Sequence, residues 1–265
     1  ARYELPQGCE LAIPVGKKDP EIEGQATHEP AFGMAALWIR SENAERARRA
    51  GYTVVDAVSV LGTHLAELIR QHAHELLSRQ DAKKLLDRVA GENPKVVEDL
   101  VPKLLPLAAV QRVLQNLLRE RVSVRDAASI LAAVSEAAAS TRNPVLLTEY
   151  VRQSIRRSLV KPYLTASGDL PAYFVEPSIE QAIESAVDHG EQNSQLGMAP
   201  QALRDVMARV ARVVGQPEAS VVVITTAGAR YFLRQIVESS LRNVIVISHN
   251  EVPPEVKVTS LGVIN

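Results

Sequence analysis

The chain has 265 residues, of which 46% are hydrophobic and 23% are charged, and its formal net charge at pH 7 is -1. This length is enough for two or three packed cores, and the composition excludes an intrinsically disordered chain. A near-neutral chain has no general positive field for nucleic acid or an anionic membrane surface, so nucleic acid is not expected as a partner.

Cys9 is the only cysteine, which excludes an intrachain disulfide and a zinc site made of paired cysteines, and which fits a reducing compartment. The sequence has no apolar run near the roughly 18 to 20 residues that span a bilayer. Its first residues, ARYELPQG, lack the basic segment and hydrophobic core of a secretion signal. We therefore expect neither a membrane span nor a signal peptide in these 265 residues.

Residues 1–56 have the pattern of a small α/β domain. Short apolar runs alternate with prolines and glycines over residues 1–40, which favours short strands and turns. Ser41 can cap a helix over residues 42–50, and a strand is expected over residues 52–56. Because the chain opens in the middle of this pattern, we expect the domain to be partial, with its first element missing.

A central helical region is predicted over residues 57–122. Apolar residues at helical spacing, preceded by an aspartate N-cap, predict one amphipathic helix over residues 57–77. Further helices are expected over about 80–90, after an Asn-Pro pair at 93–94, and over about 107–120. Short connections predict that these four helices form one compact layer. The apolar positions of the first helix are Val58, Leu61, Leu65, Leu68, Ile69 and Leu76.

A second helical domain is predicted over residues 123–163. Ser123 and Asp126 have the spacing of a capping box, followed by apolar residues at helical spacing. An Asn-Pro pair at 143–144 starts a further helix, whose apolar and basic residues fall on opposite faces. The arginines expected on its outer face are Arg152, Arg156 and Arg157.

A C-terminal α/β domain is predicted over residues 164–265. Ser178 and Gln181 resemble a capping box for a helix that ends near residue 189, and a polar loop should follow. The apolar runs SVVVITT and NVIVIS flank a helix, which is the pattern of a βαβ unit with buried parallel strands. The fold class is therefore mixed α+β, in several domains.

Candidate catalytic and metal-binding groups are few. His64, His72 and His74 do not have the three- or four-residue spacing that would place metal ligands on one helix face. The TTAGAR turn of the βαβ unit lacks both the GxGxxG spacing and a phosphate-binding GxxxxGK loop. We therefore predict no metal, no cofactor and no enzymatic activity. A small-molecule-binding α/β enzyme that uses the βαβ unit is the alternative class.

Four stretches of the sequence closely resemble the cytoplasmic domain of the FlhA family, the export-gate proteins of flagellar and virulence type III secretion. The resemblance covers most of the chain and is weaker between about 161 and 215. The ending VISHNEVPPEVKVTSLGVI looks more like the flagellar branch than the virulence branch. The stretches are EPAFGMAALWI at 29–39, GYTVVDAVSVLGTHLAELI at 51–69, HELLSRQDAKKLLDRV at 74–89 and LVPKLLPLAAVQRVLQNLLRERVSVRD at 100–126.

The resemblance implies a location and a function. The full-length protein would lie in the bacterial inner membrane, and this chain would be an N-terminally truncated part of it on the cytoplasmic side. That part would assemble into a ninefold ring beneath the export pore. It would dock export chaperone–substrate complexes and components of the ATPase complex, and it would pass cargo to the membrane channel without hydrolysing anything itself.

The resemblance also implies a partner-binding site between the central helices. In flagellar members a chaperone-binding hollow is lined by an acidic residue, a phenylalanine and a threonine, and the matching positions here are His74, Leu77 and Ala108. None of the three keeps the family residue. A hollow with an apolar floor and a polar rim suits an amphipathic helix. Leu77 has the alternative interpretation of an ordinary core residue.

Overall fold

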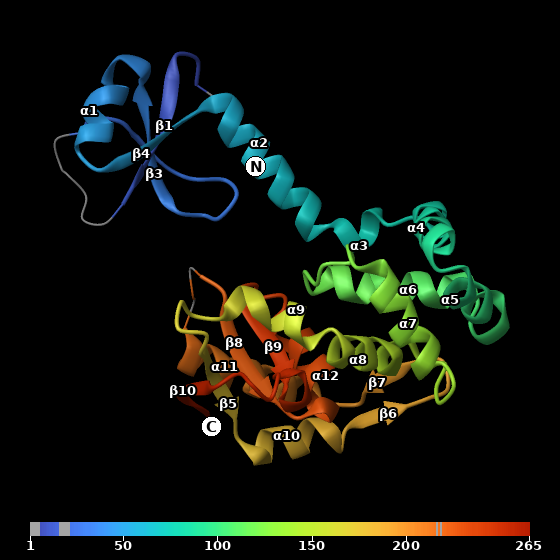
Figure 1. Cartoon of the computed structure of the whole chain (residues 1–265). Helices are drawn as coiled ribbons and strands as arrows, with labels where there is room; N and C mark the ends of the chain where they lie inside the picture. The colour runs from blue at the N-terminus through green and yellow to red at the C-terminus, as the bar shows by residue number, and fades with distance from the viewer. Residues whose placement is uncertain (1–5, 16–21, 216, 218) are drawn as a thin grey trace. The chain divides into compact units, whose positions relative to one another are not determined.

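The computed structural model describes residues 6–15, 22–215, 217 and 219–265 (Figure 1). Contacts divide the chain after His72 into two compact units. Helices and sheets occur in both, which confirms the mixed α+β fold class. The four-domain division stays a prediction. No helix among the described residues is long and apolar enough to cross a membrane.

The first unit contains a four-stranded antiparallel sheet with the strand order β2-β3-β1-β4. A turn of 3-10 helix, η1 (Ser41–Asn43), leads into helix α1 (Ala44–Arg49), which packs on strand β4 and buries Ala47 beside Tyr52. The short strands and the short helix predicted for this part are therefore confirmed. The strands are β1 (Cys9–Pro14), β2 (Gln25–His28), β3 (Ala35–Arg40) and β4 (Tyr52–Asp56).

Helix α2 (Ala57–Gln71) follows β4 directly. Its N-cap is Asp56, whose carboxylate accepts the Ser59 N–H at 2.9 Å. The helix ends at Gln71 and not at residue 77 as predicted, because the backbone leaves the helical region at His72. The apolar residues on which that prediction depended are exposed: Val58 79%, Leu61 53%, Leu65 54%, Leu68 38%, Ile69 50% and Leu76 60%.

The second unit begins with a helical layer. Buried residues of α4, α6, α7 and α8 share one apolar core, so the helices predicted separately over the central region and the next domain pack on each other. The elements are α3 (Ala73–Leu76), α4 (Arg79–Glu92), α5 (Pro94–Glu98), the π-helical turn η2 (Asp99–Leu104), α6 (Leu107–Arg119), α7 (Ala127–Ala137), α8 (Pro144–Ser154), α9 (Arg156–Val160) and the 3-10 turn η3 (Lys161–Tyr163).

Two predicted capping boxes are wrong. Asp126 alone caps α7 by accepting the Ser129 N–H, because the helix starts three residues later than the Ser123 pattern suggested. Helix α10 (Pro177–Glu184) starts with a proline, so Ser178 lies inside its first turn. The helix predicted to reach residue 189 ends at Glu184. A two-stranded hairpin follows, made of β6 (Val187–His189) and β7 (Ser194–Leu196).

A four-stranded parallel sheet with the order β10-β5-β8-β9 completes the second unit (Figure 1). Helix α12 connects the parallel neighbours β8 and β9, which confirms the predicted βαβ unit. Helices α10, α11 and α12 pack in one apolar cluster, and α9 lies in a second cluster with the sheet. The remaining elements are β5 (Leu170–Val175), α11 (Pro200–Val214), β8 (Val221–Thr225), α12 (Ala227–Val237), β9 (Val244–Ser248), the turn η4 (His249–Glu251) and β10 (Val258–Ile264).

Asn143 connects the helical layer to the β6–β7 hairpin. Its side-chain oxygen caps α8 by accepting the Val145 N–H at 2.9 Å. Its amide group donates to the carbonyl of Gly190 at 2.8 Å and to the hydroxyl of Ser194 at 2.9 Å. The residue is 1% exposed, so water cannot replace these bonds. The Asn-Pro start signal of the sequence is thus confirmed, and the same asparagine also holds the hairpin.

Asn143→Asp keeps the cap but removes the amide donors, whereas Asn143→Ala removes both. We expect both variants to lower the free energy of unfolding, by about 1–3 kcal/mol for Asp and by more for Ala, because buried acceptors lose their donors. Urea unfolding followed by circular dichroism measures the change. Wild-type stability in Asn143→Asp would contradict the importance of the hairpin contact.

Candidate partner-binding site

Helix α3 is attached to α6 by side-chain hydrogen bonds. Gln111 and Gln115 of α6 donate from their amide groups to the backbone carbonyl of Leu77, at 3.0 and 3.3 Å. The Leu77 side chain is half-buried against the core of the helical layer. It lines neither of the two hollows beside α6, so its contacts are those of a core residue.

His74 lies on α3 and lines a small hollow of about 170 Å³ beside α6. Its side chain is 18% exposed, and its Nε2 lies 3.6 Å from a carboxylate oxygen of Glu75. The Nδ1 atom is buried and makes no hydrogen bond within the described chain. Glu75 of α3 also lines this hollow, and its remaining side chains belong to α6: Arg112, Gln115, Asn116 and Arg119.

Ala108 lies exposed on the first turn of α6 and lines a larger hollow of about 580 Å³. The walls of this hollow come from α6, from the segment that leads into α8, from the β6–β7 turn and from α12. The hollow of His74 and the hollow of Ala108 share three side chains, those of Arg112, Asn116 and Arg119. We call the two together the α6 hollows.

Three residues shared by the α6 hollows were not singled out in the sequence. Arg112 and Arg119 are exposed on α6, and Asn116 is buried. Their spacing from Ala108 is the signal that could have found them, because 108, 112, 116 and 119 recur every three or four residues. This face of α6 has a small apolar residue, Ala108, at one end and a basic residue, Arg119, at the other. An ordinary solvated helix face lacks such an arrangement.

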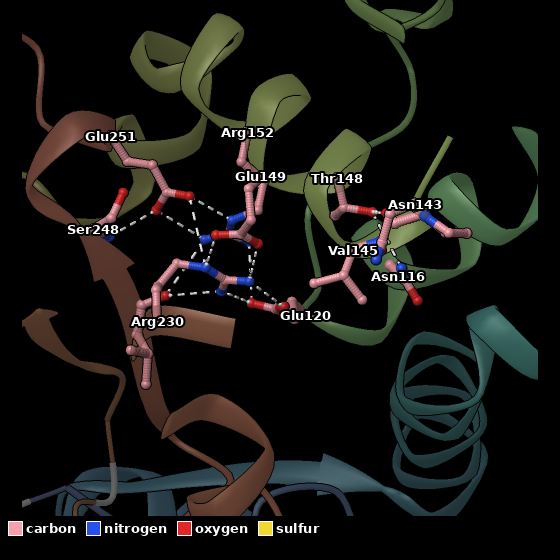
Figure 2. A network of polar contacts seen from close by, with 12 residues as sticks. Asn116, Glu120, Asn143, Val145, Thr148, Glu149, Arg152, Arg230, Ser248 and Glu251 are labelled. Atoms are coloured by element: carbon pink, nitrogen blue, oxygen red, sulfur yellow. Dashed lines mark hydrogen bonds and ion pairs between the residues drawn. The ribbon is translucent and has the colours of Figure 1, made fainter. Parts of the chain in front are cut away.

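A buried network of charges holds the far end of α6 (Figure 2). Glu120, one residue beyond α6, accepts from Arg230 of α12 at 2.5 and 3.0 Å and from Arg152 of α8 at 3.1 Å. Arg152 also donates to Glu251 of η4 at 2.6 Å, and Arg230 donates to Glu149 of α8 at 2.6 Å. The network therefore connects the helical layer to the parallel sheet.

Arg152 corrects the prediction that α8 has a basic outer face. Its side chain is 2% exposed, and Arg230 is fully buried, while Arg157 is exposed as predicted. Two guanidinium groups can be buried here because three carboxylates surround them. A helical pattern relates only residues a few positions apart, so it could not predict the partners of Arg152. Glu251 is 99 residues away in the sequence.

The two carboxylates that contact Arg230 respond differently to burial. Burial raises the pKa of Glu120, but the guanidinium groups of Arg230 and Arg152 lower it more, and the pKa lies at about 2. Burial also raises the pKa of Glu149, and there the attraction of Arg230 is insufficient, partly because Glu251 adds a like charge. Of these two carboxylates, Glu120 is therefore the more firmly ionised.

Glu120→Gln removes the central negative charge without changing the side-chain shape. We expect a loss of about 3–5 kcal/mol in the free energy of unfolding at neutral pH, because two buried guanidinium groups lose a counter-ion. The folded pKa of Glu120, about 2, lies below its ordinary value of 4.5. Its contribution is thus complete above about pH 4.5 and is lost as the pH falls toward 2.

The gap in stability between the unmodified chain and Glu120→Gln should therefore narrow below about pH 4.5. Urea titrations at several pH values between neutral and about pH 3 measure this gap. A gap that stays constant with pH would contradict the role assigned to the Glu120 charge.

The turn between β8 and α12 is occupied by the protein's own carboxylates. Glu180 of α10 accepts from the Thr226 N–H and from the Thr225 hydroxyl, both at 2.9 Å, and Glu184 accepts from the Thr226 hydroxyl. A phosphate-binding turn needs such donors to be free and needs no fixed negative charge beside them. This arrangement disfavours the nucleotide-binding alternative. Among the described residues, no group of three or more metal-ligating side chains is present.

A family model described as the FHIPEP family matches residues 1–257. The chain belongs to this family. FHIPEP proteins are transport components and not enzymes, which agrees with the predicted lack of enzymatic activity. The resemblance inferred from the four sequence stretches is thereby confirmed.

Curated relatives of this FHIPEP chain are flagellar biosynthesis proteins. FlhA of Bacillus subtilis is 32% identical over 268 residues, which cover 100% of this chain and 40% of that protein. FlhA of Escherichia coli is 37% identical over 243 residues, which cover 91% of this chain and 34% of that protein. The chain thus spans less than half the length of these two relatives.

Solved structures share the fold of this FHIPEP chain. The Chlamydia pneumoniae CdsV protein superposes with a TM-score of 0.90 at 23% identity and covers 99% of this chain and 76% of its own. Nonameric EPEC SctV-C superposes with a TM-score of 0.79 at 21% identity, with 98% and 79% covered. CdsV in complex with CdsO superposes with a TM-score of 0.86 at 23% identity, with 100% and 77% covered.

Proposed function

We propose that this chain is the cytoplasmic docking platform of a flagellar protein export gate. It receives export chaperone–substrate complexes at the α6 hollows and passes the cargo to the membrane channel formed by the rest of the protein. The observation that carries this proposal is the pair of hollows that His74 and Ala108 line, at positions marked by the family resemblance. The family match over residues 1–257 supports it.

The α6 hollows suit an amphipathic helix in size and surface. The larger hollow is about 580 Å³ and combines apolar side chains of α6 and α8 with exposed polar ones. Helix-in-groove binding uses a few apolar anchors surrounded by polar contacts. In this proposal Ala108 and His74 contact the partner, while Leu77 supports the site by fixing α3 on the helical core.

Assembly and location follow from the same proposal. The chain would form a ring with copies of itself, as nonameric EPEC SctV-C does, and would bind a component of the ATPase complex, as CdsV binds CdsO. The full-length protein would lie in the bacterial inner membrane, with this part on the cytoplasmic side. The flagellar system is favoured because two relatives named as flagellar biosynthesis proteins, FlhA of Bacillus subtilis and FlhA of Escherichia coli, are 32% and 37% identical to this chain.

Ala108→Trp should fill the larger hollow without disturbing the core, because Ala108 is exposed. We expect at least about tenfold weaker binding of a flagellar chaperone–substrate complex, because the tryptophan side chain fills the hollow in which the partner helix binds. Isothermal titration calorimetry measures the affinity. Ala132→Trp, an equally exposed change on α7 outside both hollows, is the matched control and should bind normally. Equal affinity of the two variants would rule out docking at this site.

A further inference from the structure

The larger α6 hollow is basic. Arg112 and Arg119 enter it from α6, and Arg142 enters it from the segment just before α8. No aspartate or glutamate belongs to its lining, whose other polar groups are the amides Asn116, Gln192 and Asn193 and the phenol of Tyr231. A concave surface with three cations and no anion concentrates negatively charged ligand groups.

These three arginines are not neutralised by the described part of the protein. Arg112, Arg119 and Arg142 make no ion pair with any carboxylate there, in contrast to Arg152 and Arg230. Two carboxylates near the α6 hollows have other partners. Glu120, next to Arg119 in sequence, is held by the buried network, and Glu75 of the smaller hollow lies beside His74. The positive charge in the larger hollow is therefore free for a ligand.

The larger α6 hollow also has an apolar floor, and a hydrogen bond between α6 and α8 fixes its walls. Leu105, Pro106, Ala109 and Val145 line it beside the arginines. Asn116 donates to the Thr148 hydroxyl at 3.1 Å, which fixes α6 against α8, and Figure 2 shows this contact close to Val145. A ligand that fits has an apolar group for the floor and carboxylates for the rim.

The phenol of Tyr231 adds a neutral donor to the wall. Burial raises its pKa, and the charge of Arg119 opposes the rise only in part. The hydroxyl is therefore protonated at neutral pH and can donate to a carboxylate. Guanidinium and phenol donors together make charge-assisted hydrogen bonds, which are stronger than those between neutral groups.

We propose that the larger α6 hollow recognises an acidic amphipathic helix of the export chaperone–substrate complex, in which glutamate or aspartate side chains flank an apolar anchor. The anchor packs on the floor, and the carboxylates bind Arg112, Arg119 and Arg142. This inference rests on the proposed docking function and names the chemistry of the partner. Because basic helices would be repelled, the same charges also select between partners.

The decisive variant is the double charge reversal Arg112→Glu/Arg119→Glu, tested in the full chain against a purified flagellar chaperone–substrate complex. We expect at least about tenfold weaker binding and a shallower dependence on salt concentration, because the attraction acts through charges that salt screens. Calorimetry at two salt concentrations measures both. Arg112→Lys/Arg119→Lys keeps the charge and should retain most of the affinity.

The control is Arg209→Glu/Arg242→Glu, which changes the net charge equally at exposed positions outside the hollow. It should bind almost as the unmodified chain does. If the Arg112→Glu/Arg119→Glu chain binds normally while Ala108→Trp does not, docking stands and the acidic-helix inference is wrong. If the unmodified chain binds no chaperone–substrate complex, the proposed function fails and the inference fails with it.

Discussion

The charge network around Arg230 is the interaction on which the second unit depends. It connects Glu120 at the end of α6 with Glu149 of α8 and with Glu251 after β9, and so it joins the helical layer to the sheet. Buried guanidinium groups are costly unless each has a carboxylate in contact, so no member can be lost alone. By fixing the end of α6, the network also fixes the helix face that lines the α6 hollows.

Two adjacent charged residues at the end of α6 therefore have opposite uses. Glu120 points inward and takes its charge partners from α8 and α12, whereas Arg119, one residue earlier, faces solvent and the hollow without a carboxylate partner in the described chain. Paired buried charge contributes to stability and to the unique arrangement of the elements. Unpaired charge at the rim contributes little to stability and is free to act in recognition.

Local sequence patterns predicted most helices and strands. They could not predict contacts between side chains that lie far apart in the sequence. The Asn143 helix start and the parallel β8–α12–β9 unit depend on neighbouring residues and could be read directly. Arg152 looked like a surface residue because its partners are 32 and 99 positions away. The apolar spacing of α2 correctly predicted a helix, but spacing alone does not say whether a partner covers that face.

At the candidate site, too, the sequence indicated which residues to consider but not which long-range contacts they make. The family resemblance pointed to His74, Leu77 and Ala108, but it could not indicate that two of them line hollows while the third packs on the core. The free charge of the larger hollow follows only from the arrangement of α6 against α8, α12 and the hairpin. Since Ala108 and the rim arginines are exposed, their replacement costs little folding energy. Under the proposed docking at the α6 hollows, partner preference can thus change at these positions while the buried network keeps the scaffold constant.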